Sequence, residues 1–142
     1  MSETEIRRAN AADADQIFEL AREFATSFTP ERASFDVAFA HLVDQEDTRI
    51  LVAEEGGRLI AYLLGFDHYA FFANGHVAWV EEIMVAEPQR RQGIGRALMD
   101  VFESWATERG SRLAALATRR ASTFYESLGY EETAGYFSKM LN

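Results

Sequence analysis

One stretch of the chain combines arginines and glycines at the start of a predicted helix, Arg90-Arg91-Gln92-Gly93-Ile94-Gly95-Arg96. It follows an apolar segment, residues 77–85, and a proline, Pro88. The first backbone amides of a helix have no partner inside the helix, and the helix dipole favours negative charge there. Glycine lets a phosphate group approach the backbone closely, and arginine keeps its charge near neutral pH. The sequence therefore predicts a site for a phosphorylated ligand.

Two common phosphate-binding motifs do not fit this loop. A P-loop requires Gly-Lys-Ser/Thr, whereas Gly95 is followed by Arg96 and Ala97. The dinucleotide fingerprint requires a third glycine three residues after the second, and Leu98 stands there. The sequence therefore argues against magnesium-nucleotide chemistry and against a bound dinucleotide.

The longer pattern around the loop is Val85-x-x-Pro88-x-Arg90-x-x-Gly93-x-Gly95. It resembles the Arg/Gln-x-x-Gly-x-Gly/Ala signature of the GNAT superfamily of N-acetyltransferases, although that family often has glycine where Gln92 stands. In the family the loop holds the pyrophosphate of acetyl-coenzyme A (acetyl-CoA). The resemblance therefore implies that residues 90–96 bind this cosubstrate. The alternative is an ordinary helix start whose glycines serve packing.

The resemblance also implies a binding role for the strand before the loop. In GNAT enzymes this strand parts from its neighbour, and its backbone pairs with the pantetheine arm of acetyl-CoA. Ile83, Met84 and Val85 match these positions. The same residues can belong to the core, because the backbone binds while the side chains pack.

Two adjacent glutamates are candidate bases for acetyl transfer to an amine. A free amine has a pKa of about 10.4, so it must lose a proton before it attacks. Glu81 and Glu82 lie in a predicted strand, where successive side chains face opposite sides, so at most one should face the acetyl group. Residues 79–85 resemble the corresponding strand of spermidine/spermine acetyltransferases, which favours Glu81, but a bulge would reverse this parity. Both glutamates could instead be solvated or ion-paired.

A candidate acid lies in a second motif, Ala121-x-x-Phe124-Tyr125-Glu126-x-Leu128-Gly129-Tyr130. It resembles the GNAT motif Asn-x-x-Ala-x-x-Phe-Tyr-x-x-x-Gly-Phe/Tyr, whose tyrosine sits beside the CoA sulfur. A phenol with a pKa of about 10 can donate its proton to a thiolate whose acid has a pKa of about 8.5. Tyr125 could instead be an aromatic core residue at helical spacing.

One departure from the family motif concerns Thr118, which stands where members frequently have asparagine. The threonine hydroxyl can still hydrogen-bond, so the resemblance leaves a contact between Thr118 and acetyl-CoA open. The next two residues, Arg119 and Arg120, either reach the adenosine phosphates or begin a helix in solvent.

The composition limits the other classes of function. The chain has 142 residues, which suits one domain, and 48% of them are hydrophobic, as in a folded globule. It has no cysteine, which excludes disulfides and a cysteine nucleophile and fits the cytoplasm. The net charge of −9 argues against nucleic-acid binding, and it would either attract a cationic amine or serve solubility. No apolar run approaches the roughly 20 residues that span a bilayer, and His41, His68 and His76 form no metal-binding pattern.

Hydrophobic spacing predicts the elements that position these residues. The first half is predicted as a strand at 6–9, a helix capped by Asn10 and continuing to Phe28, a helix over 35–42, and two strands at 50–53 and 59–66. An aromatic loop follows, and it either shapes an acceptor pocket, packs on the protein or forms a dimer contact; it contains Tyr69, Phe71 and Phe72.

The second half is predicted as a strand at 77–85, a helix ending at Gly110, a buried strand at 113–117, a helix at 121–128 and two strands around Gly135. The long helix should bury one face, formed by Leu98, Val101, Phe102 and Trp105. The order is strand, two helices, three strands, helix, strand, helix, two strands. This mixed α/β order is that of the GNAT fold, and the resemblance covers nearly the whole chain as a single domain, residues 1–142.

The resemblance implies a cytoplasmic enzyme that transfers the acetyl group of acetyl-CoA directly to a primary amine of a small molecule. Acidic charge and the likeness to polyamine acetyltransferases favour a polyamine weakly, while protein amines, amino sugars and amino acids remain open. The alternative is an acyl-CoA-binding sensor or partner-binding module on the same fold that does not catalyse. Homodimers are common in the family, and nothing in this sequence specifies one.

Overall fold

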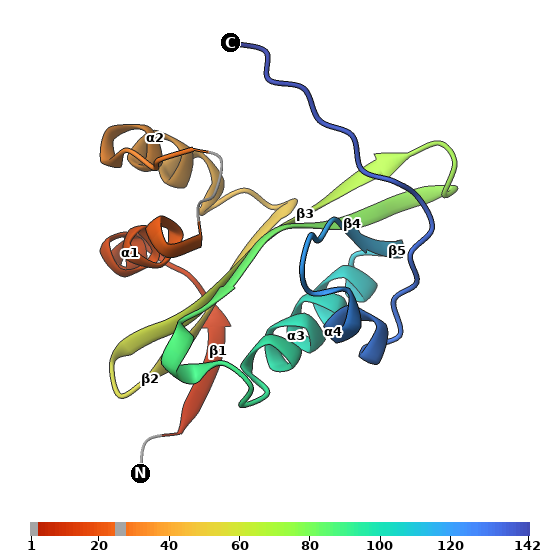
Figure 1. Ribbon diagram of the computed structural model, residues 1–142. Helices are drawn as coiled ribbons and strands as arrows, with labels where there is room; N and C mark the ends of the chain where they lie inside the picture. The colour runs from red at the N-terminus through yellow and green to blue at the C-terminus, as the bar shows by residue number, and fades with distance from the viewer. Residues whose placement is uncertain (1–2, 25–27) are drawn as a thin grey trace.

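A sheet of five strands forms the centre of the computed structural model, which describes residues 3–24 and 28–142 (Figure 1). In spatial order the strands are β1 (Thr4–Arg8), β2 (Thr48–Glu55), β3 (Arg58–Ala70), β4 (Gly75–Val85) and β5 (Ser111–Leu116). The pairs from β1 to β4 are antiparallel, whereas β4 and β5 run parallel. A parallel pair cannot be joined by a tight turn, so the chain must cross over one face of the sheet between β4 and β5.

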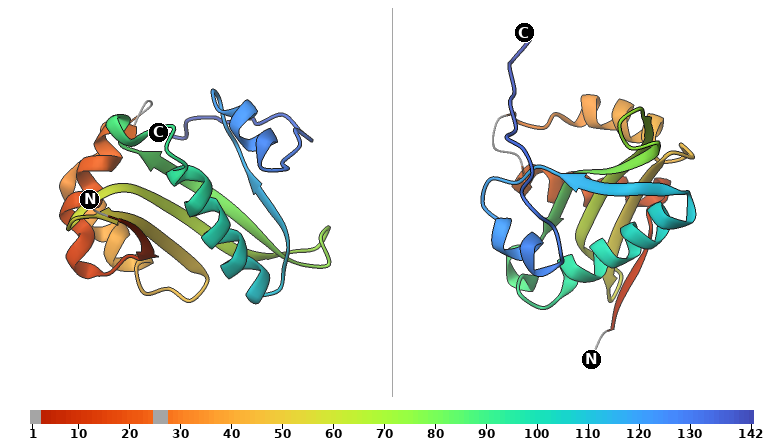
Figure 2. Two further views of the ribbon diagram at one scale, coloured as in Figure 1. Left: turned by 90° about the horizontal axis from the view of Figure 1, so that it is seen from below. Right: turned by 90° about the vertical axis from the view of Figure 1, so that its right-hand side faces the viewer.

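Helices cover both faces of the sheet (Figures 1 and 2). α1 (Ala14–Phe24) and α2 (Arg32–Leu42) lie on one face. α3 (Ile94–Glu108) forms the crossover on the other face, and the short α4 (Ser122–Ser127) lies beside it. The protein therefore has three layers, and the helix that follows the glycine loop is held against the sheet.

Each face of the sheet has its own hydrophobic core. On the α3 face, Leu98, Met99 and Phe102 are fully buried against β2, β3 and β4. On the other face, Ile17 of α1 and Phe39 of α2 pack against the same strands. Because β2 and β3 are buried on both sides, they are apolar on both faces, which is unusual for an antiparallel pair.

Most predicted elements are confirmed, with differences at their ends. β3 continues to Ala70, so Tyr69 lies in a strand and the predicted aromatic loop is shorter. Residues 25–27 of the predicted first helix lie outside the described residues, and Phe28 is exposed beyond α1. Val101 was expected in the core but is 38% exposed, because it lies at the border of the buried face of α3.

The two final strands expected around Gly135 are wrong. Residues 131–142 form neither a strand nor a helix, and the sheet ends at β5. A tight hairpin usually needs a left-handed residue in its turn, and Gly135 does not take that conformation. As a result β5, which was expected to be buried, is an edge strand, and Leu113 is 46% exposed.

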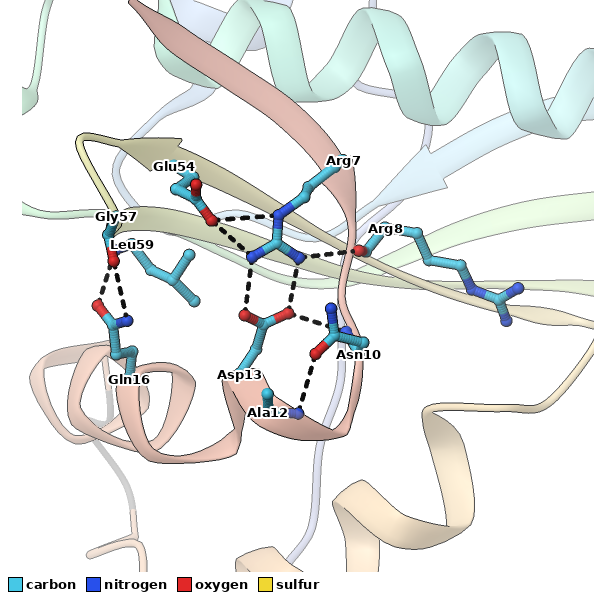
Figure 3. A network of polar contacts seen from close by, with 9 residues as sticks. All are labelled: Arg7, Arg8, Asn10, Ala12, Asp13, Gln16, Glu54, Gly57 and Leu59. Atoms are coloured by element: carbon cyan, nitrogen blue, oxygen red, sulfur yellow. Dashed lines mark hydrogen bonds and ion pairs between the residues drawn. The ribbon is translucent and has the colours of Figure 1, made fainter. Parts of the chain in front are cut away.

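Arg7 of β1 ties three segments together (Figure 3). Its Nη1 and Nη2 atoms each donate a 2.8 Å hydrogen bond to the carboxylate of Asp13, and Nη2 donates another of 2.7 Å to Glu54 of β2. Asp13 also accepts the backbone amide of Asn10, whose own side chain caps the turn as predicted by accepting from Ala12. The hydrogen bonds from Arg7 hold the pKa of Asp13 below its usual range, although burial acts in the opposite direction.

We expect Asp13→Asn to lower the free energy of unfolding by about 1–3 kcal/mol at pH 7, because it weakens charged hydrogen bonds in a half-buried cluster. The folded pKa of Asp13 is lowered, so this stabilisation is present above the unfolded pKa of about 3.9 and is lost as the pH falls through the folded pKa. Urea unfolding at several pH values should therefore show a difference from wild type that shrinks in acid.

The matched control is Glu19→Gln, which removes an ion pair with Arg22 whose side chains are 67% and 57% exposed. It should change the free energy of unfolding by less than about 1 kcal/mol at any pH. A difference for Asp13→Asn that stays constant down to pH 2 would contradict the assigned role of Arg7.

Candidate active site

The loop between β4 and α3 has an unusual backbone. A 3₁₀ turn, Glu87–Gln89, is followed by two residues with positive φ, Arg91 at 67° and Gly93 at 83°. The first hydrogen bond of α3 runs from the amide of Ala97 to the carbonyl of Gly93 (3.0 Å). The amides between these two residues therefore have no acceptor within the helix, which is the arrangement expected of an anion site.

The two glycines of the loop are needed for different reasons. Gly93 takes the left-handed conformation that begins α3, and a Cβ atom there would meet nothing within 4 Å. A Cβ atom at Gly95 would lie 3.2 Å from Cζ of Phe124 in α4. Gly93 thus serves the backbone turn and leaves open space beside it, whereas Gly95 lets α4 pack against the start of α3.

The arginines of the loop differ in their contacts. Arg90 turns back onto β4, where its Nε donates to the carbonyl of Val85 (2.9 Å). Arg91 is exposed, and with Glu87 and Arg90 it lines a hollow of about 350 Å³. Gln92 donates to the carbonyl of Pro88 (3.4 Å), which closes the loop on itself. Arg90 and Gln92 therefore fix the loop, and Arg91 presents its charge to solvent.

β4 and β5 separate partway along β4. Their parallel register pairs His76 with Ser111 and ends where Val80 lies opposite Leu116. β4 continues to Val85, directly before the loop, while β5 stops at Leu116. The backbone of Ile83, Met84 and Val85 therefore has β3 on one side and no strand on the other among the described residues.

A buried carboxylate holds the two strands together at the other end. Asp67 of β3 is 2% exposed; it hydrogen-bonds His76 of β4 and accepts a 2.7 Å bond from Ser111 of β5. Nε of Arg109, a residue just before β5, lies 3.4 Å from Oδ2 of Asp67. Burial raises the pKa of Asp67, but the hydrogen bonds from Ser111 and His76 and the charge of Arg109 outweigh it, so this pKa lies below its usual range.

A β-bulge decides where the two glutamates point. Leu64 of β3 lies opposite Glu82, while the next residue, Gly65, lies opposite Val80, so Glu81 is the extra residue. Val80 and Ile83 consequently pack on the α3 side. Glu82 instead hydrogen-bonds a residue of the α1–α2 core, and Glu81 is exposed at the bulge.

Tyr62 contacts one of the candidate site residues, Glu82, and was not identified from the sequence. It is 2% exposed in the α1–α2 core, and its hydroxyl donates a 2.7 Å hydrogen bond to Oε1 of Glu82. Burial and the neighbouring carboxylate raise the pKa of Tyr62, so its hydroxyl stays protonated near neutral pH. The only signal in the sequence was a hydroxyl group within the apolar run of β3, and without the bulge its partner could not be identified.

Tyr125 lies in α4 and is 7% exposed. Its ring contacts Phe124 and Tyr130, with centroids 4.9 Å and 6.0 Å away, and it shares the α3-side core with Val80 and Ile94. Burial raises the pKa of Tyr125, which keeps its proton on near neutral pH. Tyr125 thus belongs to the same core as Val80, the last residue of β4 that pairs with β5, and as Ile94, the first residue of α3.

Thr118 and the arginines after it lie between β5 and α4. The hydroxyl of Thr118 accepts the amide of Ala121 (3.1 Å), so it fixes the turn into α4. Arg119, Arg120 and, on α3, Arg96 are not buried. Because the hydroxyl of Thr118 acts as an acceptor in this contact, it can still donate a hydrogen bond to another group.

Three exposed aromatic residues, Tyr69, Phe71 and Phe72, surround the turn between β3 and β4. This turn precedes the first residue of β4, whereas the glycine-containing loop follows the last residue of β4. Eleven residues of strand separate the two ends by roughly 35 Å. The aromatic residues therefore lie at the end of β4 that is far from the loop.

Within residues 3–24 and 28–142 there is no group of three or more His, Cys, Asp or Glu side chains that could hold a metal ion. None of the helices in this part of the chain combines the length and apolarity needed to cross a bilayer.

The sequence and the fold both match known acetyltransferases. The model of the acetyltransferase (GNAT) family matches residues 14–130. The uncharacterized N-acetyltransferase YhfO of Bacillus subtilis is 26% identical over 144 residues, covering 96% of each chain. The aminoalkylphosphonate N-acetyltransferase of Salmonella typhimurium is 28% identical over 142 residues, covering 96% of this chain and 91% of the relative.

Solved structures share the arrangement of strands and helices. Glucosamine-6-phosphate N-acetyltransferase from Arabidopsis thaliana superposes with a TM-score of 0.87 at 20% identity, covering 99% of both chains. The aminoglycoside N-acetyltransferase AAC(6')-Iy, in complex with CoA, superposes with a TM-score of 0.86 at 18% identity, covering 99% of this chain and 95% of that one. With the family model spanning most of its length, this chain belongs to the GNAT family of N-acetyltransferases.

Proposed function

We propose that this N-acetyltransferase moves the acetyl group of acetyl-CoA directly to a primary amine of a small molecule. The observation that carries the proposal is the opening between β4 and β5, which leads to the unpaired amides at the start of α3. Tyr125 lies in the core beside this opening, and Glu81 and Glu82 lie at the bulge on its rim. With no cysteine in the chain, direct attack by the amine is the simplest route.

The residues present fit acetyl-CoA, which would supply the acetyl group as a thioester. The free edge of Ile83, Met84 and Val85 can pair with an extended amide-bearing chain as a strand would. Beyond it, the amides of Gly93 to Arg96 and the side chain of Arg91 can hold a pyrophosphate. Ile94 and Gly95 contribute backbone only, because Ile94 is buried and Gly95 has no side chain.

The two glutamates can have different roles toward the amine, one binding it and the other removing its proton. Tyr62 fixes Oε1 of Glu82 and leaves Oε2 to receive a cationic amine from the α1–α2 side. Glu81, the extra residue of the bulge, has no such partner in the described part of the chain and is free to take up a proton. We therefore assign Glu81 as the base, acting directly or through water, and Glu82 as the residue that binds the ammonium group.

Net charge and the names of relatives support a short panel of candidate acceptors. The net charge of −9 favours cationic molecules, which include polyamines. The relatives act on an aminoalkylphosphonate and on aminoglycosides by name. The acceptor panel is therefore a polyamine, an aminoalkylphosphonate, an aminoglycoside and an amino sugar phosphate, compared by kcat/KM.

Binding of acetyl-CoA is tested first, by thermal unfolding with and without ligand. At 100 times its dissociation constant, acetyl-CoA should stabilise the protein by about 2.7 kcal/mol, a shift of several degrees, whereas acetate and ATP should have much smaller effects. No shift at millimolar acetyl-CoA would overturn the proposed function. A shift without acetylation of any amine would instead support the acyl-CoA sensor.

Glu81→Gln should lower kcat by about 10²-fold or more at neutral pH, because the amine then keeps its proton. The loss should shrink as the pH approaches about 10.4, where the amine is already neutral. Glu82→Gln is the matched variant, and it should mainly raise the KM for the amine, by about 10- to 100-fold, since one charged hydrogen bond is lost. The opposite pattern in the two pH profiles would exchange the roles.

Tyr125→Phe keeps the ring in the core and removes the proton that we assign to the departing thiolate. We expect kcat to fall by about 10²-fold or more while acetyl-CoA still shifts the unfolding temperature. Tyr69→Phe, on an exposed ring at the far end of β4, is the control. A loss of less than about threefold at Tyr125 would show that the hydroxyl is not the acid.

A further inference from the structure

α4 carries Tyr125, but its own hydrogen bonds do not fix its place on the protein. The amides of Leu128 and Tyr130 both donate to the carbonyl of Tyr125 (3.0 Å each), so they close the end of the helix on itself. With six residues, Ser122–Ser127, the helix is shorter than one that is stable alone. Its position must therefore come from contacts with α3, beside which it lies (Figures 1 and 2).

One polar side chain joins this segment to α3. The hydroxyl of Tyr130 donates a 2.7 Å hydrogen bond to Oε2 of Glu103. Within the part of the chain that the structure describes, no other hydrogen bond joins residues 118–142 to the residues before them. Burial and the Glu103 carboxylate raise the pKa of Tyr130, so its hydroxyl keeps its proton and remains the donor near neutral pH.

The packing between α4 and α3 is apolar. Phe124 lies at the start of α3, where a Cβ atom at Gly95 would be 3.2 Å from its ring. Gly95 and Glu103 are roughly 12 Å apart along the axis of α3, so the segment is held at two separate points. Apolar packing has no preferred direction, whereas a hydrogen bond restricts both distance and angle. The bond from Tyr130 to Glu103 is therefore the contact that sets where α4 lies along α3.

Tyr130 is also fixed to Tyr125. Its ring meets the ring of Tyr125 edge to face, with centroids 6.0 Å apart and planes at 71°, and its amide bonds the Tyr125 carbonyl. A movement of Tyr130 is thus passed on to Tyr125 through the ring and the backbone. We propose that Tyr130, tethered to Glu103, is a positioning residue that holds the hydroxyl of Tyr125 where it donates its proton to the departing thiolate. This role rests on the proposed function, because Tyr130 acts through Tyr125.

Tyr130→Phe tests this role by removing one oxygen atom from the whole protein, assayed with the best acceptor of the panel. kcat should fall about tenfold, because a displacement of about 1 Å at the proton donor slows the transfer. The KM values for acetyl-CoA and for the amine should stay within about twofold, since the glycine loop and the glutamates are unchanged. Tyr136→Phe makes the same change on a tyrosine that is 68% exposed, and it should leave kcat unchanged.

Variants of Glu103 separate the hydrogen bond from the charge. Glu103→Ala should reproduce the loss of kcat seen in Tyr130→Phe, because the hydroxyl then has no acceptor. Glu103→Gln keeps an oxygen that can accept the bond, so it should lose less than about threefold. Equal losses in Glu103→Ala and Glu103→Gln would overturn the tether.

A double variant separates positioning from general packing. Tyr125→Phe combined with Tyr130→Phe should be no slower than Tyr125→Phe alone, because Tyr130 acts through the hydroxyl that is already gone. A further loss in the double variant, or an unchanged kcat in Tyr130→Phe, would overturn the positioning role and leave Tyr125 as the acid. A loss of less than about threefold in Tyr125→Phe would overturn the acid role and the positioning role together, so the two failures are distinguishable.

Hydrogen exchange followed by mass spectrometry tests the tether without a substrate. The backbone amides of residues 121–130 should exchange about tenfold faster in Tyr130→Phe than in the wild type, because a charged hydrogen bond no longer holds α4 on α3. The amides of α3 should exchange as before, and Tyr136→Phe should match the wild type throughout. Unchanged exchange over residues 121–130 in Tyr130→Phe would overturn the proposal.

Discussion

β4 has a strand on both sides along its first half and on one side along its second half, and the site depends on that difference. In a closed sheet the free backbone groups after Val80 would pair with β5, and a ligand could not use them. The loop follows directly from the end of β4, and α3 begins within a few residues of it. One strand thus presents a free backbone edge and leads directly to the loop that we propose as the anion site.

The separation of β4 from β5 is stable only if the two strands are held together where they still pair. Asp67 holds them there, because its carboxylate contacts β4 through His76 and β5 through Ser111. Arg109 adds charge to this cluster and stacks on Trp105 of α3, whose ring lies 5.4 Å from its guanidinium carbon. The crossover helix and the two parallel strands are therefore fixed where they are paired, and β5 can diverge toward α4 without loosening the sheet.

Local patterns in the sequence predicted much of this. Helical spacing identified α3, and the glycines and arginines identified the loop, because both signals lie within a few residues of each other. The bulge at Glu81 could not be predicted from local sequence, because it depends on how β3 and β4 align over their whole length. Without it the partner of Tyr62 could not be found. The two strands expected around Gly135 failed for a related reason, because a strand forms only when a distant part of the chain pairs with it, and local sequence does not show that pairing.

The strain in the loop is located where the proposed function needs it. Two residues other than glycine have positive φ, Asn74 and Arg91, within the described residues. Asparagine tolerates this conformation in a turn, whereas arginine held there costs about 1–3 kcal/mol. The hydrogen bonds of Arg90 with Val85 and of Gln92 with Pro88 hold the loop on either side of Arg91. These contacts offset the unfavourable conformational free energy of Arg91. In a relaxed loop Arg91 could move away from the first amides of α3. The strained loop keeps the charge of Arg91 beside these amides before an anion binds, so binding requires less ordering of the loop.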